Sequence, residues 1–433
     1  MAKIAPFAGL RYGPGLRGAM PRLVTPPYDI ISPGEQTRFY RSHPCNFIRL
    51  EFGRIRPSDH PQNNRYTRAQ HTLAEWLRRG VVRRDPQPAL YLLQTRYQAP
   101  DGKPVCFSGL FAGVFLEPFG EGKVLPHEQT FSGPRTDRFQ LLCATGVSFS
   151  PVLALYRDHG QKLSRLLGQA RKRAADMSFR DWAGSRHQLW ILKQPKLVQA
   201  IRKEFLGKRL LIADGHHRYL TALKYRQECG AQAGPAADYV MTCLTEMHDP
   251  GLLVLPVIRL VSGVPSGRWR EFERKLPEYF EVEQIAPSKL LAAQSAAKGP
   301  DPVIGYLGDR GKRAWLLRAR MRRLEQAADP RLTGHSRVYG RLDVVVLNYW
   351  LLETLLGIKP GEEAGRLRFT KSPQEARRCV TGRTAQAAFF PSRPNVEAIW
   401  DLARQGETLP QKSTYFLPKV ISGLVMNPVG LKE

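Results

Sequence analysis

One short run of residues has the clearest capacity for chemistry: Asp214–Gly215–His216–His217–Arg218. The apolar residues Leu210–Ala213 before it predict a buried strand, and the apolar spacing after it predicts a helix. A helix that begins here offers unpaired N–H groups and a partial positive charge, which attract phosphate. Gly215 lets a ligand approach the backbone closely. The pattern therefore favours a site for phosphate and metal.

A purely structural interpretation is that Asp214 caps the helix and the histidines pack locally. Four polar groups in five residues, directly after a buried strand, suit a core poorly, so we favour a functional site. Asp214 is then expected to hold Mg²⁺ or to orient a hydroxyl. The side chains of His216, His217 and Arg218 are expected to hold phosphate oxygens.

A second candidate is the pair His127–Glu128, within Pro126–His127–Glu128–Gln129–Thr130. It is no zinc-protease motif, because Phe131 stands where the second histidine would be required. A lone His–Glu pair on a loop is more often a surface turn, so the residues alone do not assign it a role.

The elements that must position these residues follow from periodicity and turn signals. We expect a helix at 66–79, a hairpin of strands 89–97 and 107–116 joined through Asp101–Gly102, and a helix at 136–145. Further along we expect a strand at 150–156, helices at 159–176 and 195–205, strands at 239–245 and 252–260, and an apolar helix at 342–356. The domain prediction is an N-terminal α+β segment at 1–104, a central core at 105–262 and a C-terminal α+β domain at 263–433.

Composition limits the class of protein. The chain has 433 residues, 42% of them hydrophobic, which is typical of globular proteins. Its formal net charge is +28, which suits a polyanionic partner, but the basic residues are mostly Arg and scattered, as a coding bias would also leave them. The six cysteines form no CxxC pair, so we expect reduced thiols. No apolar run is long enough to span a bilayer or to serve as a signal peptide, so we expect no membrane partner and a cytoplasmic location.

The ordered motifs resemble the domain-of-unknown-function 1015 family nearly end to end. They are Pro6–Phe7, Pro26–Pro27–Tyr28–Asp29, His43–Pro44–Cys45–Asn46–Phe47, His127–Glu128–Gln129–Thr130, Asp137–Arg138, Asp214–Gly215–His216–His217–Arg218–Tyr219, Asp249–Pro250–Gly251–Leu252, Pro410–Gln411–Lys412–Ser413–Thr414–Tyr415–Phe416 and Pro418–Lys419. The chain departs from the family pattern at Ile258, where a histidine is usual, and at Cys45, where an aromatic residue is common. Neither departure touches the two candidate motifs.

The order of these motifs also looks like the ParB/sulfiredoxin-like fold and its ADP-dependent free-serine kinases. That resemblance implies that Glu128 is the base on the acceptor hydroxyl and that Asp214 is the metal or hydroxyl partner. It also implies a phosphate or nucleotide cradle formed by Gly215, His216, His217 and Arg218, with His127 beside it.

We therefore expect an α+β protein: a ParB/sulfiredoxin-like central domain with additional N- and C-terminal α+β segments. The expected function is a nucleotide-dependent small-molecule kinase that uses Mg²⁺ with ADP or ATP and phosphorylates free serine or a similar hydroxylated metabolite. Two alternatives stay open. One is a nucleotide-gated nucleic-acid-binding protein of the ParB kind, which the charge suits, and the other is a nucleotide-binding regulator without catalysis.

Overall fold

The computed structural model describes residues 2–129, 133–327, 329–359, 361 and 365–430. Its internal contacts divide the chain into two units. The first unit holds Met1–Pro126, Thr130–Leu253 and Phe416–Glu433, and the second holds His127–Gln129 and Val254–Tyr415. The chain therefore enters the second unit briefly with three residues before it returns there for most of its C-terminal half.

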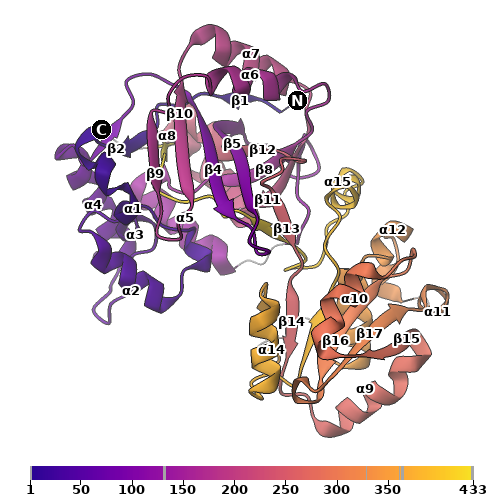
Figure 1. The fold of residues 1–433 in the computed structure, drawn as a ribbon. Helices are drawn as coiled ribbons and strands as arrows, with labels where there is room; N and C mark the ends of the chain where they lie inside the picture. The colour runs from indigo at the N-terminus through magenta and orange to yellow at the C-terminus, as the bar shows by residue number, and fades with distance from the viewer. Residues whose placement is uncertain (1, 130–132, 328, 360, 362–364, 431–433) are drawn as a thin grey trace. The chain divides into compact units, whose positions relative to one another are not determined.

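A mixed sheet of nine strands forms the framework of the first unit (Figure 1). Its antiparallel centre is the hairpin of β4 and β5, flanked by β12 and β10. The strands, in spatial order, are β6 (Val124–Leu125), β11 (Leu210–Asp214), β8 (Val152–Tyr156), β12 (Tyr239–Glu246), β5 (Pro104–Phe115), β4 (Leu90–Gln98), β10 (Arg186–Leu192) and β9 (Met177–Arg180), with β1 (Ile4–Ala5) paired to β5. The candidate motif of Asp214 thus follows a strand near one edge of this sheet.

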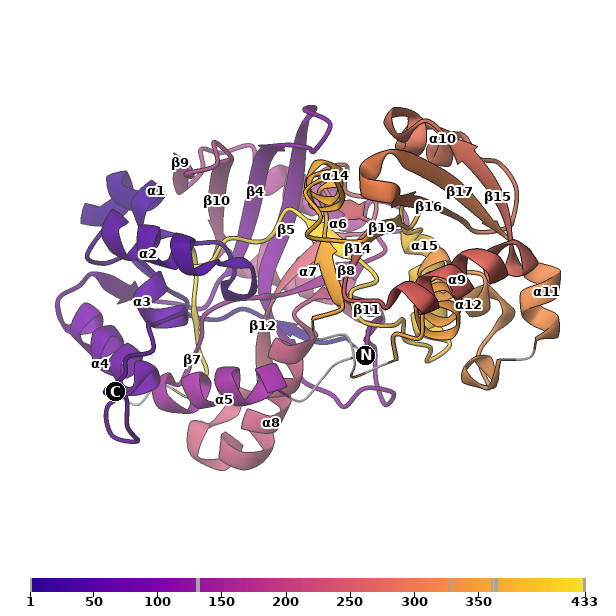
Figure 2. The ribbon, with the colours of Figure 1, turned by 90° about the horizontal axis from the view of Figure 1, so that it is seen from below.

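Three helices bury their apolar sides in the main core of this sheet. They are α6 (Lys162–Ala170), α7 (Pro195–Phe205) and α8 (His216–Ala233). Each helix contributes a side chain to that core that is at most 1% exposed, namely Leu163, Ile201 and Tyr219. Helix α5 (Gly133–Thr145) lies along α8 (Figure 2), where Leu142 packs against Tyr225. This packing fixes the direction in which α8 leaves β11.

The second unit contains a six-stranded sheet. Its strands, in spatial order, are β15 (Phe280–Ile285), β17 (Arg313–Ala319), β16 (Val303–Gly308), β19 (Ala387–Phe390), β14 (Ile258–Val261) and β18 (Leu367–Thr370). Helix α9 (Ser266–Tyr279) and a helical stretch, Asp343–Val345 continued by the π-helical turns Val346–Leu355, share one core with the sheet. Helix α14 (Pro373–Thr381) packs in a second core on Leu260 and Ala388.

Most of the predicted elements are confirmed, among them the hairpin, the strand before Asp214 and the helix after it. The predicted 66–79 helix is α4 (Arg65–Arg78), whose first turn is capped by Asn64. The structure also confirms a mixed α+β protein and free thiols at all six cysteines. Among the described helices, none is long and apolar enough to cross a membrane.

Two predicted elements are wrong in extent. The helix at 159–176 ends at Ala170, because residues 171–176 carry no large apolar side chain to continue its buried stripe. The strand at 252–260 is split into β13 (Leu253–Leu255) and β14, since Pro256 has no N–H to donate to a ladder. The predicted domain boundaries at residues 104 and 262 stay predictions, because the two units divide the chain elsewhere. Thr130 of the second motif lies outside the described residues.

Candidate functional site

The turn from β11 into α8 has the geometry that the sequence predicts for it. β11 ends at Asp214, Gly215 takes a left-handed conformation with φ of 91°, and α8 begins at His216. No side chain caps the first turn of α8, since the residue at the cap position is glycine. The turn therefore has the partial positive charge of a helix N-terminus, which favours an anion.

Two cations hold the carboxylate of Asp214. Lys419 Nζ lies 2.5 Å from Oδ1, and Arg218 Nη2 lies 2.5 Å from Oδ2. Arg218 also donates to the carbonyl of Pro151. Burial raises the pKa of Asp214, but the charges of Lys419 and Arg218 outweigh it and hold that pKa well below its ordinary value. Asp214 is therefore ionised at neutral pH and fixed in direction.

Lys419 is a site residue that the sequence prediction missed. It stands in the Pro418–Lys419 motif, but nothing local connects it to Asp214, 205 residues earlier in the chain. It reaches Asp214 because the segment from Phe416 onward returns to the first unit. The one feature of the sequence that marks Lys419 as a candidate site residue is its place in the Pro418–Lys419 family motif.

A second buried polar group adjoins Arg218. Glu51 is 2% exposed, and its carboxyl accepts a hydrogen bond from the Ser150 hydroxyl. Arg138 donates to the Glu51 carbonyl at 2.9 Å and lies over the Tyr28 ring, 3.9 Å from its centroid. Glu51, Arg138, Ser150 and Arg218 line a cavity of about 50 Å³, large enough for ordered water. These contacts tie the two N-terminal motifs of Tyr28 and Arg138 to the turn at Asp214.

Glu51 makes the stability of the protein depend on pH. Burial raises its pKa from 4.5 to about 7, although Arg138 opposes the shift. A carboxyl whose folded pKa is raised stabilises the fold below its unfolded pKa and loses this contribution as pH rises through the folded pKa. The wild type should therefore lose about 3 kcal/mol of unfolding free energy, relative to Glu51→Gln, as pH rises from 4.5 to beyond 7.

Urea unfolding of both proteins across this pH range measures the difference directly. The variant cannot ionise at position 51, so every other titrating group cancels in the comparison. A difference between the two proteins that stays constant with pH would contradict the assignment.

Gly215 is a position of this turn that tolerates a side chain poorly. A Cβ there would lie 2.9 Å from the Cζ and Nε atoms of Arg218, and the left-handed backbone is strained for any other residue by about 1–2 kcal/mol. We expect Gly215→Ala to displace Arg218 from Asp214 and to weaken nucleotide binding. Calorimetric titration with ADP measures the affinity.

The same helix offers a matched control at its other end. Gly234 also has a left-handed φ, 77°, but a Cβ there would meet nothing within 4 Å. Gly234→Ala should lose at least as much stability, because its ψ of −173° lies in a region that glycine almost alone adopts, with no change in ADP affinity. Equal losses of affinity in the two variants would show that backbone strain alone is responsible.

The His127–Glu128 motif is held within the second unit by the segment at Leu409–Thr414. Leu409 N–H donates to the His127 carbonyl at 2.8 Å, and the Gln129 N–H donates to the Leu409 carbonyl at 3.1 Å. The Lys412 N–H donates to Glu128 Oε1 at 2.9 Å, while His127 Nε2 lies 2.9 Å from Thr414 Oγ1. The C-terminal motif thus orients both side chains of the His–Glu pair.

Arg259 is a second residue that the sequence prediction missed. Its side chain is fully buried on β14, and one terminal nitrogen donates to the Val257 carbonyl at 2.5 Å. Its Nε and other terminal nitrogen have no hydrogen-bond partner within the described residues. Burial lowers the pKa of Arg259 to about 10, and the carboxylate of Glu128 opposes this shift. A buried guanidinium with unpaired donors is costly unless an anion binds it.

Ile258, which replaces the family histidine, does not share the environment of Arg259. It lies in the core against α14 and is 2% exposed. Neighbouring residues on a strand point to opposite faces, so Ile258 and Arg259 face different layers.

The described part of the chain has no group of three His, Cys, Asp or Glu side chains that could hold a metal ion. Asp214 can act as one ligand of a magnesium ion. Lys419 and Arg218 each occupy one lone pair of a carboxylate oxygen, and each oxygen has a second lone pair for a metal. Mg²⁺ commonly binds through one or two carboxylates and the phosphates of a substrate.

The structure brings Asp214, Gly215, His216, His217 and Arg218 together at one turn of the first unit. His127 and Glu128 belong to the second unit, with Arg259. The two groups therefore lie in different units, and the catalytic roles predicted for these residues stay predictions.

The fold and the site define a class of protein: a mixed α+β chain with a charged turn between a strand and a helix. A family model, "Protein of unknown function (DUF1015)", matches residues 4–345. The chain belongs to the DUF1015 family, which confirms the family predicted from its motifs. No curated protein matches the chain.

Solved structures show a distant likeness. A mutant free serine kinase in complex with AMP is 13% identical with a TM-score of 0.35, over 72% of this chain and 87% of that chain. A conserved hypothetical protein from Pyrococcus furiosus is 14% identical with a TM-score of 0.34, over 68% and 87%. SbnI with a C-terminal truncation, from Staphylococcus aureus, is 15% identical with a TM-score of 0.33, over 68% and 79%. The proposal below therefore rests on the residues of this chain.

Proposed function

We propose that the protein is a nucleotide-dependent small-molecule kinase that phosphorylates the hydroxyl of free serine or of a similar hydroxylated metabolite. The observation that carries this proposal is the buried group of Asp214, Arg218 and Lys419 at the uncapped start of α8. It combines fixed positive charge, a helix start without a side-chain cap and an ionised carboxylate at one turn. The proposed fold of the central core is ParB/sulfiredoxin-like.

The phosphates of ADP or ATP are assigned to the start of α8. The N–H groups of its first turn and the side chains of His216 and His217 hold the phosphate oxygens. Phosphoryl transfer depends mainly on positioning and charge neutralisation, so a fixed cationic turn suits it. Mg²⁺ is assigned to Asp214 and the phosphates, where it would neutralise further charge on the transferred group.

Glu128 is assigned as the base that takes the proton of the acceptor hydroxyl. As the hydroxyl oxygen forms its bond to phosphorus, the proton passes to the Glu128 carboxylate and the bond to the nucleotide oxygen breaks. The Lys412 N–H on Oε1 fixes the carboxylate, and the other oxygen is the acceptor of the proton. The unpaired donors of Arg259 suit an acceptor that carries its own carboxylate, which is why an amino acid is preferred to a neutral sugar.

The proposal is tested by nucleotide consumption that depends on the acceptor. The protein is incubated with Mg²⁺ and ADP or ATP, and the nucleotide products are separated by chromatography after addition of serine, threonine, homoserine or glycerol. We expect turnover with at least one hydroxy amino acid. Alanine, which has the carboxylate but no hydroxyl, should give none, and equal turnover with alanine would indicate simple hydrolysis.

A further inference from the structure

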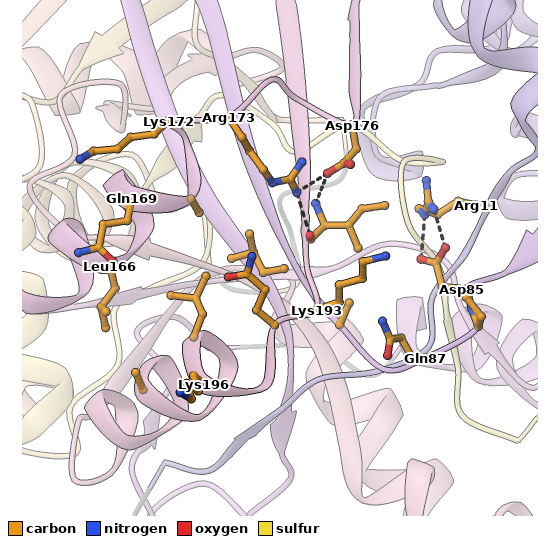
Figure 3. A pocket seen from close by; sticks show the side chains of 18 residues that line it. Arg11, Asp85, Gln87, Leu166, Gln169, Lys172, Arg173, Asp176, Lys193 and Lys196 are labelled. Carbon is orange, nitrogen blue, oxygen red and sulfur yellow. Dashed lines mark hydrogen bonds and ion pairs between the residues drawn. The ribbon is translucent and has the colours of Figure 1, made fainter.

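A large cavity lies in the first unit, away from the Asp214 turn. Its volume is about 870 Å³, within the range of small-molecule sites, and none of its lining residues belongs to the Asp214 group. Its walls come from α6, α7, the end of β10 and the N-terminal segments around Arg11 and Asp85 (Figure 3). It is therefore a second place where this chain can enclose a ligand.

The two carboxylates of this cavity are already neutralised by arginines. Arg11 donates to both oxygens of Asp85, at 2.8 and 2.5 Å, and the Tyr91 hydroxyl donates to Asp85 at 2.7 Å. Arg173 Nη2 lies 2.6 Å from Asp176, as the dashed lines in Figure 3 show. Both carboxylates of the lining are therefore paired within the protein, and they do not neutralise its other cations.

Three lysines of the lining have no such partner. Within the described residues, no carboxylate oxygen lies within 4 Å of the Nζ atoms of Lys172, Lys193 or Lys196, all of which are exposed. With two arginines and two aspartates paired, these lysines give the lining a net charge of +3. Figure 3 places them around the cavity, with Lys172 on one side, Lys193 at the centre and Lys196 on α7. The cavity therefore attracts anions.

The remaining lining is largely apolar. Leu166 and Ala170 of α6, Leu197 and Ala200 of α7, and Ile191 of β10 contribute it. A ligand that fits both parts carries an anionic group for the lysines and a flat or apolar group for the space between the helices. Nucleic acid fits less well, since its backbone charges repeat along an extended groove while these lysines surround one half-open cavity.

We propose that this cavity binds a phosphorylated small molecule with an aromatic or apolar moiety, at a site separate from the proposed kinase site. The phosphate pairs with Lys172, Lys193 and Lys196, and the ring rests between α6 and α7. This proposal does not depend on the proposed function, because none of its residues takes part in phosphoryl transfer.

Pyridoxal 5′-phosphate is a probe of this chemical class that also reports which lysine it meets. The lysine amine attacks the aldehyde carbon and water leaves, which gives an imine. Borohydride then delivers hydride to the imine carbon, and the resulting secondary amine is mapped by peptide mass spectrometry. We expect labelling of Lys172, Lys193 or Lys196 at least about tenfold above the labelling of Lys203, since a charge-assisted pair with phosphate is worth more than 1.4 kcal/mol.

Lys203 is a matched control because it is also exposed and lies on α7 outside the cavity. In Lys193→Glu/Lys196→Glu, half-maximal labelling of Lys172 should need about ten times more probe, while Lys203→Glu leaves it unchanged. AMP should protect the cavity lysines, and pyridoxal without phosphate should label all exposed lysines alike. Glu128→Gln should label as the wild type does, which separates this site from the kinase site.

Several results would overturn the proposal. One is even labelling of the exposed lysines by pyridoxal 5′-phosphate, and another is the same pattern with pyridoxal alone. Protection by a short single-stranded oligonucleotide but not by AMP would assign the lysines to nucleic acid instead. Thermal unfolding of each variant shows whether loss of labelling reflects loss of the fold.

Discussion

Glu128→Gln is expected to lose nearly all phosphorylation of the acceptor while it binds nucleotide with the affinity of the wild type. Glutamine has the same shape and keeps an oxygen for the Lys412 N–H, so the segment should stay paired with Leu409. Its amide cannot take the hydroxyl proton, and loss of a general base lowers the rate by roughly 10²–10⁴. Product formation and ADP affinity are measured by mass spectrometry and calorimetric titration.

A glutamate of the same unit serves as the control. Glu407 Oε2 lies 2.9 Å from His335 Nδ1, and it accepts from the Ser336 N–H, so Glu407→Gln also removes a partly buried charge near Leu409. It should turn over as the wild type does. Phosphorylated product at the normal rate from Glu128→Gln would end the assignment of Glu128 as the base.

Asp214→Asn is expected to lower the free energy of unfolding by about 3–5 kcal/mol, because Arg218 and Lys419 then remain buried without their counter-charge. The same loss should leave the turn with a stronger attraction for anions. Pyrophosphate should therefore raise the melting temperature of the variant by more than it raises that of the wild type. Thermal unfolding with and without pyrophosphate measures both effects.

Another Asp–Arg pair, whose arginine also lies on α8, provides the comparison. Arg226 Nε lies 2.8 Å from Asp238, and both side chains are about a third exposed. Asp238→Asn should cost no more than about 1 kcal/mol, since solvent screens such pairs, and pyrophosphate should add no extra stability. If Asp214→Asn behaves like Asp238→Asn in both respects, the turn at α8 is no phosphate cradle.

Local pattern predicted the turn at Asp214 well. Strand, glycine and helix follow each other within a few residues, so period and turn chemistry are sufficient to place them. The hairpin of β4 and β5 was predictable for the same reason. Each of these features is decided by residues that are neighbours in the sequence.

The partners of the site residues were not predictable in this way. Lys419 meets Asp214 because the end of the chain returns to the first unit after residue 415. Lys412 and Thr414 meet Glu128 and His127 because residues 127–129 belong to the second unit. Propensity and periodicity contain no information about contacts between residues more than 200 positions apart. Arg259 was missed because a basic residue within a strand pattern does not reveal whether its guanidinium is paired.

The most direct test of the proposed function is the mass of the acceptor itself. Serine is incubated with the full chain, Mg²⁺ and ADP or ATP, and the free amino acid is analysed by mass spectrometry against the Glu128→Gln protein. We expect O-phosphoserine, or the phosphate ester of another hydroxy amino acid in a panel, with the wild type alone. Nucleotide binding without any phosphorylated acceptor would contradict it, and binding of nucleic acid that weakens steeply with salt would then favour the ParB-like alternative.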